Sequence, residues 1–75
     1  MKLSEDNIKT LLRDGITFIV RSDDYRYSEL EEFARLSAAN ETPMTLVVGD
    51  NLTFNEARAL AKISCKNIVL DTSRN

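Results

Sequence analysis

Four aspartates are the residues of this chain whose type and placement are most suggestive of chemistry. Asp23 and Asp24 follow one short apolar stretch, Asp50 follows a second, and Asp71 ends a third. If these stretches are parallel strands, the aspartates lie at their carboxyl ends, where α/β proteins bind ligands, and carboxylate oxygens suit Mg²⁺. One hypothesis is therefore a small metal-dependent enzyme or phosphotransfer domain. The competing interpretation is structural, because aspartate is also common in turns and near helix starts.

Other catalytic groups are scarce. The chain has no histidine, which is the commonest general base. Its only glycines, Gly15 and Gly49, belong to no phosphate-binding motif. The single cysteine, Cys65, follows a predicted helix and has no helix N-terminus beside it to activate a thiolate. We expect Cys65 to be a small, partly buried apolar residue, and we predict no catalytic residue and no cofactor.

The segment Tyr25-Arg26-Tyr27 suggests binding rather than catalysis. Tyrosine and arginine are enriched where proteins contact one another, and this segment lies in a predicted turn after the first strand. The structural alternative is that Tyr27 packs at the start of the next helix while Tyr25 packs on the edge of the sheet.

Length and composition limit the classes of protein. The 75 residues form one domain, 1–75, with 43% apolar residues and a net charge of −2. The basic residues are scattered, which argues against nucleic-acid binding. No apolar run approaches the ~20 residues of a membrane span. A single cysteine permits no internal disulfide and favours a reducing, cytoplasmic location.

Three helix starts form the clearest pattern in the sequence. Ser4 is a good N-cap before an acidic first turn. Ser28 and Thr53 each precede a glutamate by three residues, Glu31 and Glu56, as in a capping box. The three caps are 24 and 25 residues apart, which suggests a repeated unit.

Each predicted helix leads into a short run rich in β-branched residues. The helices are expected to end at Gly15, near Asn40 and near Ser64, and the strands to cover 16–21, 44–48 and 67–71. The order α-β-α-β-α-β predicts a parallel sheet with right-handed crossovers. The three helix–strand units span about 3–21, 27–48 and 52–71.

Part of the chain resembles a leucine-rich repeat. Leu46, Val48 and Asn51 have the spacing of that family's L-x-L-x-x-N element, and residues 51–61 resemble its strand-to-helix half. The resemblance implies a stack of β/α units and, in that family, protein binding on the sheet face.

Alternation along the strands predicts that only one face of the sheet is covered. One set of alternate residues is wholly apolar: Ile16, Phe18, Val20, Met44, Leu46, Val48, Ile68 and Leu70. The other set is mixed: Thr17, Ile19, Arg21, Thr45, Val47, Gly49, Asn67, Val69 and Asp71. All helices on one face require a two-layer fold with strand order 1-2-3, and the alternative is a flavodoxin-like 2-1-3 order.

The uncovered face leads to the functional prediction. In the 1-2-3 order we expect Ile19, Val47 and Val69 to lie side by side, as an apolar stripe that marks an interaction surface. We predict a non-enzymatic protein-binding module whose partner is another protein or a second copy, with no nucleic acid or membrane involved. Replacing Val47 by Asp should then abolish association and leave the fold intact. The predicted contact residues are Ile19, Arg21, Tyr25, Arg26, Tyr27, Val47 and Val69.

Overall fold

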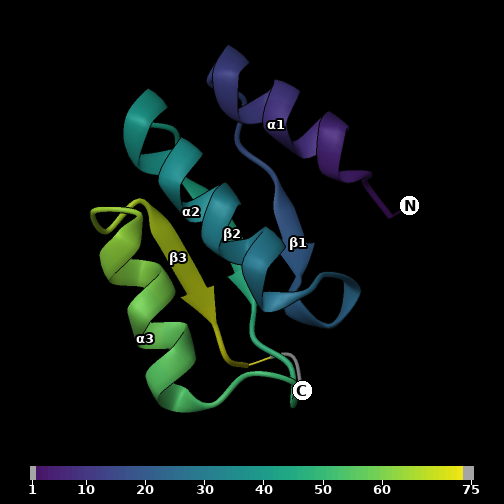
Figure 1. Ribbon diagram of the computed structural model, residues 1–75, viewed down its shortest axis with the longest axis vertical. Coiled ribbons are helices and arrows are strands. Elements are labelled where there is room, and N and C mark those ends of the chain that lie inside the picture. The colour runs from purple at the N-terminus through teal and green to yellow at the C-terminus, as the bar shows by residue number, and fades with distance from the viewer. Residues whose placement is uncertain (1, 74–75) are drawn as a thin grey trace.

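The computed structural model describes residues 2–73. The elements follow one another as α1 (Glu5–Asp14), β1 (Ile19–Arg21), the 3-10 turn η1 (Ser22–Asp24), α2 (Tyr27–Asn40), β2 (Met44–Val47), α3 (Phe54–Ile63) and β3 (Ile68–Asp71). The predicted alternation of helices and strands is confirmed, and Figure 1 shows the three units in sequence.

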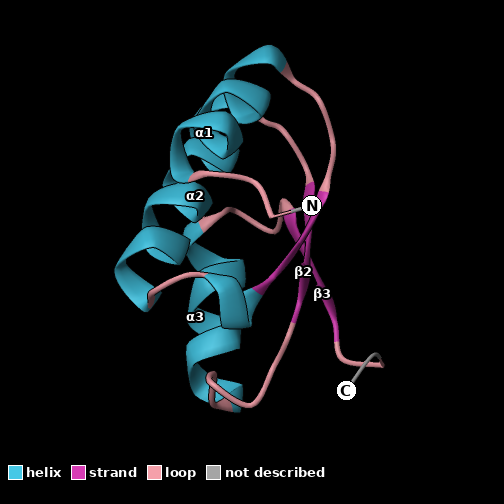
Figure 2. Ribbon diagram, turned by 90° about the vertical axis from the view of Figure 1, so that its right-hand side faces the viewer, coloured by secondary structure: helices cyan, strands magenta, loops and turns pink. Residues whose placement is uncertain are grey.

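The molecule has two layers. The strands form one parallel sheet in the order β1-β2-β3, so the predicted 1-2-3 order is confirmed and the 2-1-3 alternative is wrong. Seen from the side, the helices lie together against one face of the sheet, and no helix of the described chain lies on the other face (Figure 2). Right-handed crossovers from β1 to β2 and from β2 to β3 place α2 and α3 on the same face, and α1 packs beside α2 in that layer.

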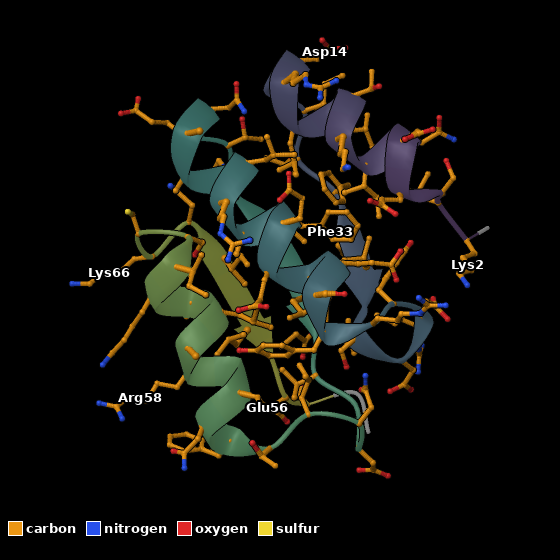
Figure 3. All side chains as sticks on the ribbon, viewed as in Figure 1. Lys2, Asp14, Phe33, Glu56, Arg58 and Lys66 are labelled. Atoms are coloured by element: carbon orange, nitrogen blue, oxygen red, sulfur yellow. The ribbon has the colours of Figure 1, made fainter. Side chains whose placement is uncertain are left out.

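The core lies between the helix layer and the sheet. Phe33 of α2 is fully buried near the centre of the molecule, whereas Arg58 and Lys66 extend outward from the region of α3 (Figure 3). The strand residues predicted to face the helices mostly do so. Those that are buried are Val20, Met44, Leu46 and Ile68, and those partly buried against the core are Phe18, Val48 and Leu70.

Ile16 is the exception, and its expected place in the covered face is wrong. Gly15 ends α1 in the left-handed conformation at φ 75°, as predicted. The amide of Ile16 then donates to the carbonyl of Leu11 at 3.0 Å, so Ile16 belongs to the helix terminus and is 49% exposed. Residues 16–18 connect the helix layer to the sheet. The strand β1 is therefore shorter than predicted and covers only Ile19–Arg21.

Two of the three predicted caps are confirmed. The hydroxyl of Ser4 accepts a hydrogen bond from the amide of Asn7 at 3.1 Å at the start of α1. At the start of α3, Thr53 accepts from the amide of Glu56 at 3.1 Å, and the Glu56 carboxylate accepts from the amide of Thr53 at 2.9 Å. This reciprocal pair is the predicted capping box.

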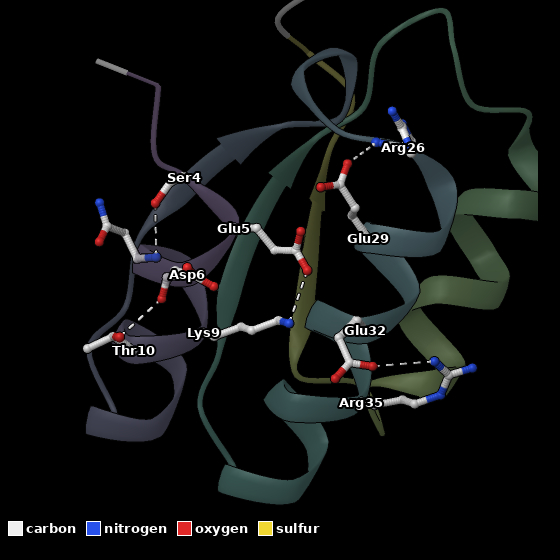
Figure 4. A network of polar contacts seen from close by, with 10 residues as sticks. Ser4, Glu5, Asp6, Lys9, Thr10, Arg26, Glu29, Glu32 and Arg35 are labelled. Carbon is white, nitrogen blue, oxygen red and sulfur yellow. Dashed lines mark hydrogen bonds and ion pairs between the residues drawn. The ribbon is translucent and has the colours of Figure 1, made fainter.

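The predicted cap at Ser28 is wrong, because α2 begins two residues earlier. Arg26 is the N-cap, and its amide donates to the carboxylate of Glu29 at 2.9 Å (Figure 4). Glu29 thus takes the role expected of Glu31, and Ser28 is an exposed residue of the first turn. The three caps are therefore unequally spaced, and the regular repeat of 24 and 25 residues does not hold.

Buried hydroxyls join the units at the amino ends of β2 and β3. Thr42 donates to the carbonyl of Leu12 at 2.8 Å, and Ser37 donates to the carbonyl of Thr42 at 2.6 Å. Beside β3, Ser64 accepts from the amide of Ile68 at 3.0 Å. These bonds satisfy polar groups inside the core. Cys65, in the turn after α3, is exposed, which corrects its expected partial burial.

Candidate interaction surface

The face of the sheet opposite the helices is the candidate functional site. We call it the open face and define it by the outward residues of the strands: Ile19, Arg21, Thr45, Val47, Val69 and Asp71. They form two rows across the sheet, Ile19-Thr45-Val69 and Arg21-Val47-Asp71.

The first row contains most of the exposed apolar surface of this face. Ile19 is 54% exposed and Val69 is 55% exposed, and Thr45 lies between them in register. Large aliphatic side chains this exposed, on the two edge strands of one sheet face and under no helix of residues 2–73, are typical of surfaces that contact another molecule. The prediction that Ile19 and Val69 lie uncovered is confirmed.

Val47 differs from the prediction in both row and exposure. It lies in the second row between Arg21 and Asp71, so it is not beside Ile19 and Val69. It is only 4% exposed, although it belongs to no part of the helix-covered core cluster. Val47 therefore contributes almost no exposed surface to the open face.

Tyr25 is a core residue, which corrects its expected role as a contact residue. The ring is 8% exposed and meets the ring of Phe33 edge-on, with centroids 5.4 Å apart. Its hydroxyl donates to the carbonyl of Leu3 at 2.5 Å. Burial raises the pKa of Tyr25, and the charges of Asp24 and Glu29 raise it further. Tyr25 therefore ties the segment before α1 to the start of α2.

The other two residues of this segment lie at the start of α2. Arg26 is exposed, and its backbone is held by Glu29. Tyr27 is partly buried and packs against the core, with its pKa raised first by burial and then by Glu31 and Glu56. Of the predicted Tyr25–Tyr27 loop, Arg26 alone has an exposed side chain.

The four aspartates do not assemble into a metal site. Among residues 2–73, no three His, Cys, Asp or Glu side chains lie close enough together to hold an ion. Asp50 is exposed in the loop after β2. The carboxylate of Asp71 accepts from both the amide and the hydroxyl of Ser73, at 3.0 and 2.7 Å. The magnesium hypothesis therefore has no geometric support.

A polar cluster that the sequence reasoning missed joins the loops after β1 and β2. Buried Ser22 donates to the side-chain oxygen of Asn51 at 2.7 Å and accepts from the amide of Gly49 at 2.7 Å. The amide group of Asn51 donates back to the carbonyl of Ser22 at 2.9 Å. These bonds hold β1 and β2 together beyond their last paired residues. The available signal was the presence of a glycine and an asparagine two residues apart directly after a strand.

The backbone of Gly49 is in close contact with the side chain of Asp23. A Cβ atom at this position would lie 1.8 Å from a carboxylate oxygen of Asp23. Asp23 therefore packs on the backbone of the neighbouring loop, which is a structural role rather than a catalytic one.

Two hollows lie beside the segment that precedes α1. One, of about 390 Å³, adjoins the open face and includes Ile19, Arg21 and Val47 in its lining. The other, of about 600 Å³, lies between the starts of α1 and α2. Both are lined by Lys2, Leu3, Asp24 and Tyr25. The amino group of Lys2 lies 5.7 Å from the centre of the Tyr25 ring, a cation–π contact at their shared wall.

The outer surface of the helix layer has a different character. Its charges pair within single helices, as in Glu5–Lys9 at 3.0 Å and Glu32–Arg35 at 3.8 Å (Figure 4). The hydrogen bond from Lys9 lowers the pKa of Glu5, and Glu5 in turn raises the pKa of Lys9. Such solvated pairs are ordinary surface features. Because these charged side chains are paired and solvated, the open face is the stronger candidate for recognition of a binding partner.

No family of known proteins, no curated protein and no solved structure matches this chain. Within residues 2–73, none of the helices has the length and apolarity needed to cross a membrane.

Proposed function

We propose that this chain is a non-enzymatic protein-binding module whose contact surface is the open face. The observation that carries the proposal is the exposure of Ile19 and Val69, 54% and 55%, on a sheet face under no helix of residues 2–73. Covering these two side chains with a protein surface removes apolar area from water. This stabilises the complex by roughly 25 cal/mol for each Å² of apolar area buried.

Two further features support the same surface. Arg21 at its rim is exposed, and arginine is enriched at protein interfaces. Leu46, Val48 and Asn51 carry the leucine-rich-repeat-like spacing, and that family binds proteins on its sheet face. Arg26 lies outside the open face, at the start of α2, and could extend the contact beyond the sheet edge. The expected location is the cytoplasm, since the lone Cys65 is unpaired.

Site-specific photo-crosslinking tests the proposal. A photoreactive amino acid would replace Ile19 or Val69 in the full chain, and Arg35 on α2 would be the control position because its side chain is 60% exposed on the helix layer. We expect adducts in cells from positions 19 and 69 but not from 35. Adducts formed at position 19 should be lost when Val69→Asp is introduced.

Equal labelling at all three positions, or none at the open face, would overturn the proposal. The mass of each adduct identifies its partner. Twice the chain mass of 8.5 kDa indicates a second copy, and any other mass indicates a different protein.

A further inference from the structure

The first helix is attached to the rest of the molecule less extensively than the third. In the helix layer, α2 lies between α1 and α3 (Figure 1). Helix α3 packs against both α2 and β3, whereas α1 packs chiefly against α2, with Ile8 and Leu12 fully buried. An element with one main packing partner has fewer contacts to break when it leaves the core.

Two long-range hydrogen bonds hold α1 in place, one at each end. Before the helix, the hydroxyl of Tyr25 donates to the carbonyl of Leu3 at 2.5 Å, and the amino group of Lys2 lies over the same ring. Near the end of the helix, the hydroxyl of Thr42 donates to the carbonyl of Leu12 at 2.8 Å. The donors lie 22 and 30 residues further along the chain, so both bonds break if α1 moves away from α2.

The connection from α1 to β1 is suited to act as a hinge. Residues 15–17 are exposed, and Gly15 adopts the left-handed conformation. The strand β1 is held by bonds that do not involve α1. It pairs with β2 along Ile19–Arg21, and Ser22 joins the loop after β1 to the loop after β2. A movement of α1 can therefore end at residues 15–17 and leave the sheet intact.

We infer that residues 2–14 form a detachable unit, which leaves the core as a whole about the hinge at residues 15–17 while the sheet, α2 and α3 stay folded. This inference does not depend on the proposed function. It concerns the same region, because Lys2 and Leu3 line the hollow that adjoins the open face, together with Ile19 and Tyr25. Detachment removes that wall and uncovers the Tyr25 ring, which is 8% exposed when the unit is in place.

Native-state hydrogen exchange tests the inference. A helix of ten residues is marginal by itself in water, so the amides of Ile8 and Leu12 exchange whenever the unit leaves the core. We expect both to exchange at least about tenfold faster than the amides of Phe33 and Ala34 in α2, which require global unfolding. Their rates should also depend less steeply on urea, because detachment exposes less surface than global unfolding.

Variants at the two ends of α1 and in β3 separate detachment from other kinds of opening. Tyr25→Phe and Thr42→Val each remove one of the two hydroxyls, and each should accelerate exchange at both Ile8 and Leu12 by about fivefold. Ile68→Val, on the buried face of β3, is the matched control. It should accelerate exchange in α2 by a similar factor of about fivefold. It should leave the amides of α1 unchanged, because β3 stays folded when the unit detaches.

Equal acceleration of α1 and α2 by Ile68→Val would overturn the inference, because α1 would then open only with the whole molecule. Acceleration by each hydroxyl variant at the nearer end of α1 alone would also overturn it, since that is fraying of the helix. Circular dichroism first checks that each variant is folded. If one is not, the urea dependence of exchange in the unaltered chain decides, and a dependence shared by Ile8, Leu12 and Phe33 would overturn the inference.

Discussion

The two faces of the sheet are built from alternate residues of the same three strands, but the side chains of one face are buried and large side chains of the other face are exposed to solvent. Val20, Leu46 and Ile68 are 5%, 0% and 6% exposed beneath the helices. Ile19 and Val69, of similar size and apolarity, are more than half exposed on the other side. Side-chain chemistry alone therefore does not separate the faces. The difference arises because the two crossovers, through α2 and α3, have the same hand and direction, which puts both helices on one side of the sheet. The helix α1 precedes β1 and packs beside α2 in the same layer.

The largest contrast between the faces should appear in stability. Leu46→Ala empties a fully buried position on the central strand and should cost about 4 kcal/mol. That is a large share of the ~4–11 kcal/mol typical of a chain this size. Ile19→Ala, on the open face, should cost about 0.5 kcal/mol or less. Urea unfolding followed by circular dichroism measures both, and similar losses for the two variants would contradict the comparison.

Val47 is the residue that does not fit a simple division into covered and open faces. Because it is 4% exposed, Val47→Asp buries a charge and should cost about 3 kcal/mol. Val69→Asp, on the same face, should change stability by only about 0.5 kcal/mol. This replaces the expectation that Val47→Asp leaves the fold intact. Thermal unfolding of the two variants decides the matter, and an unaffected Val47→Asp protein would show that the position is accessible.

Strand order and layer arrangement could be predicted because they depend on regular patterns. Helix caps at Ser4 and Thr53, the left-handed Gly15 and the alternation along 44–48 and 67–71 each agree with one topology. These signals are local, and right-handed crossovers convert them into a three-dimensional arrangement.

The details of the candidate site could not be predicted because they depend on contacts between units. Which residue lies opposite Val69 is a matter of register, and register placed Thr45 there rather than Val47. The burial of Tyr25 depends on a carbonyl at Leu3, 22 residues earlier in the chain. The role of Gly49 depends on the approach of Asp23 from a neighbouring loop. The hydrophobic periodicity of a single helix or strand contains no information on such contacts between different elements.

Gly49 tests whether the carboxyl ends of the strands are held by close loop packing. Gly49→Ala places a Cβ 1.8 Å from the Asp23 carboxylate, so this exposed side chain must turn away, and the change should cost about 1 kcal/mol. Combining it with Asp23→Ala removes the obstructing carboxylate and should recover most of that loss.

Gly15 provides the matched control for this pair. Gly15→Ala meets no atom within 4 Å but strains a left-handed residue at φ 75°, so it should cost about 1 kcal/mol. That loss should be the same with or without Asp23→Ala. Chemical denaturation of the four variants separates the two mechanisms, and an equal rescue of both glycine variants would contradict the loop contact.

The smallest expected losses of stability concern residues at the starts of the helices. These helices form the layer that covers one face of the sheet. Ser4→Ala and Thr53→Ala each remove a hydroxyl that accepts a first-turn amide, and each should cost about 1 kcal/mol. Ser28→Ala should be neutral or slightly stabilising, because Ser28 is an exposed residue inside α2 and alanine favours the helix. Glu29→Ala should instead destabilise α2, since its carboxylate binds the amide of Arg26. Urea midpoints of these variants rank the positions, and a loss at Ser28 equal to that at Thr53 would show that α2 begins at Ser28 after all.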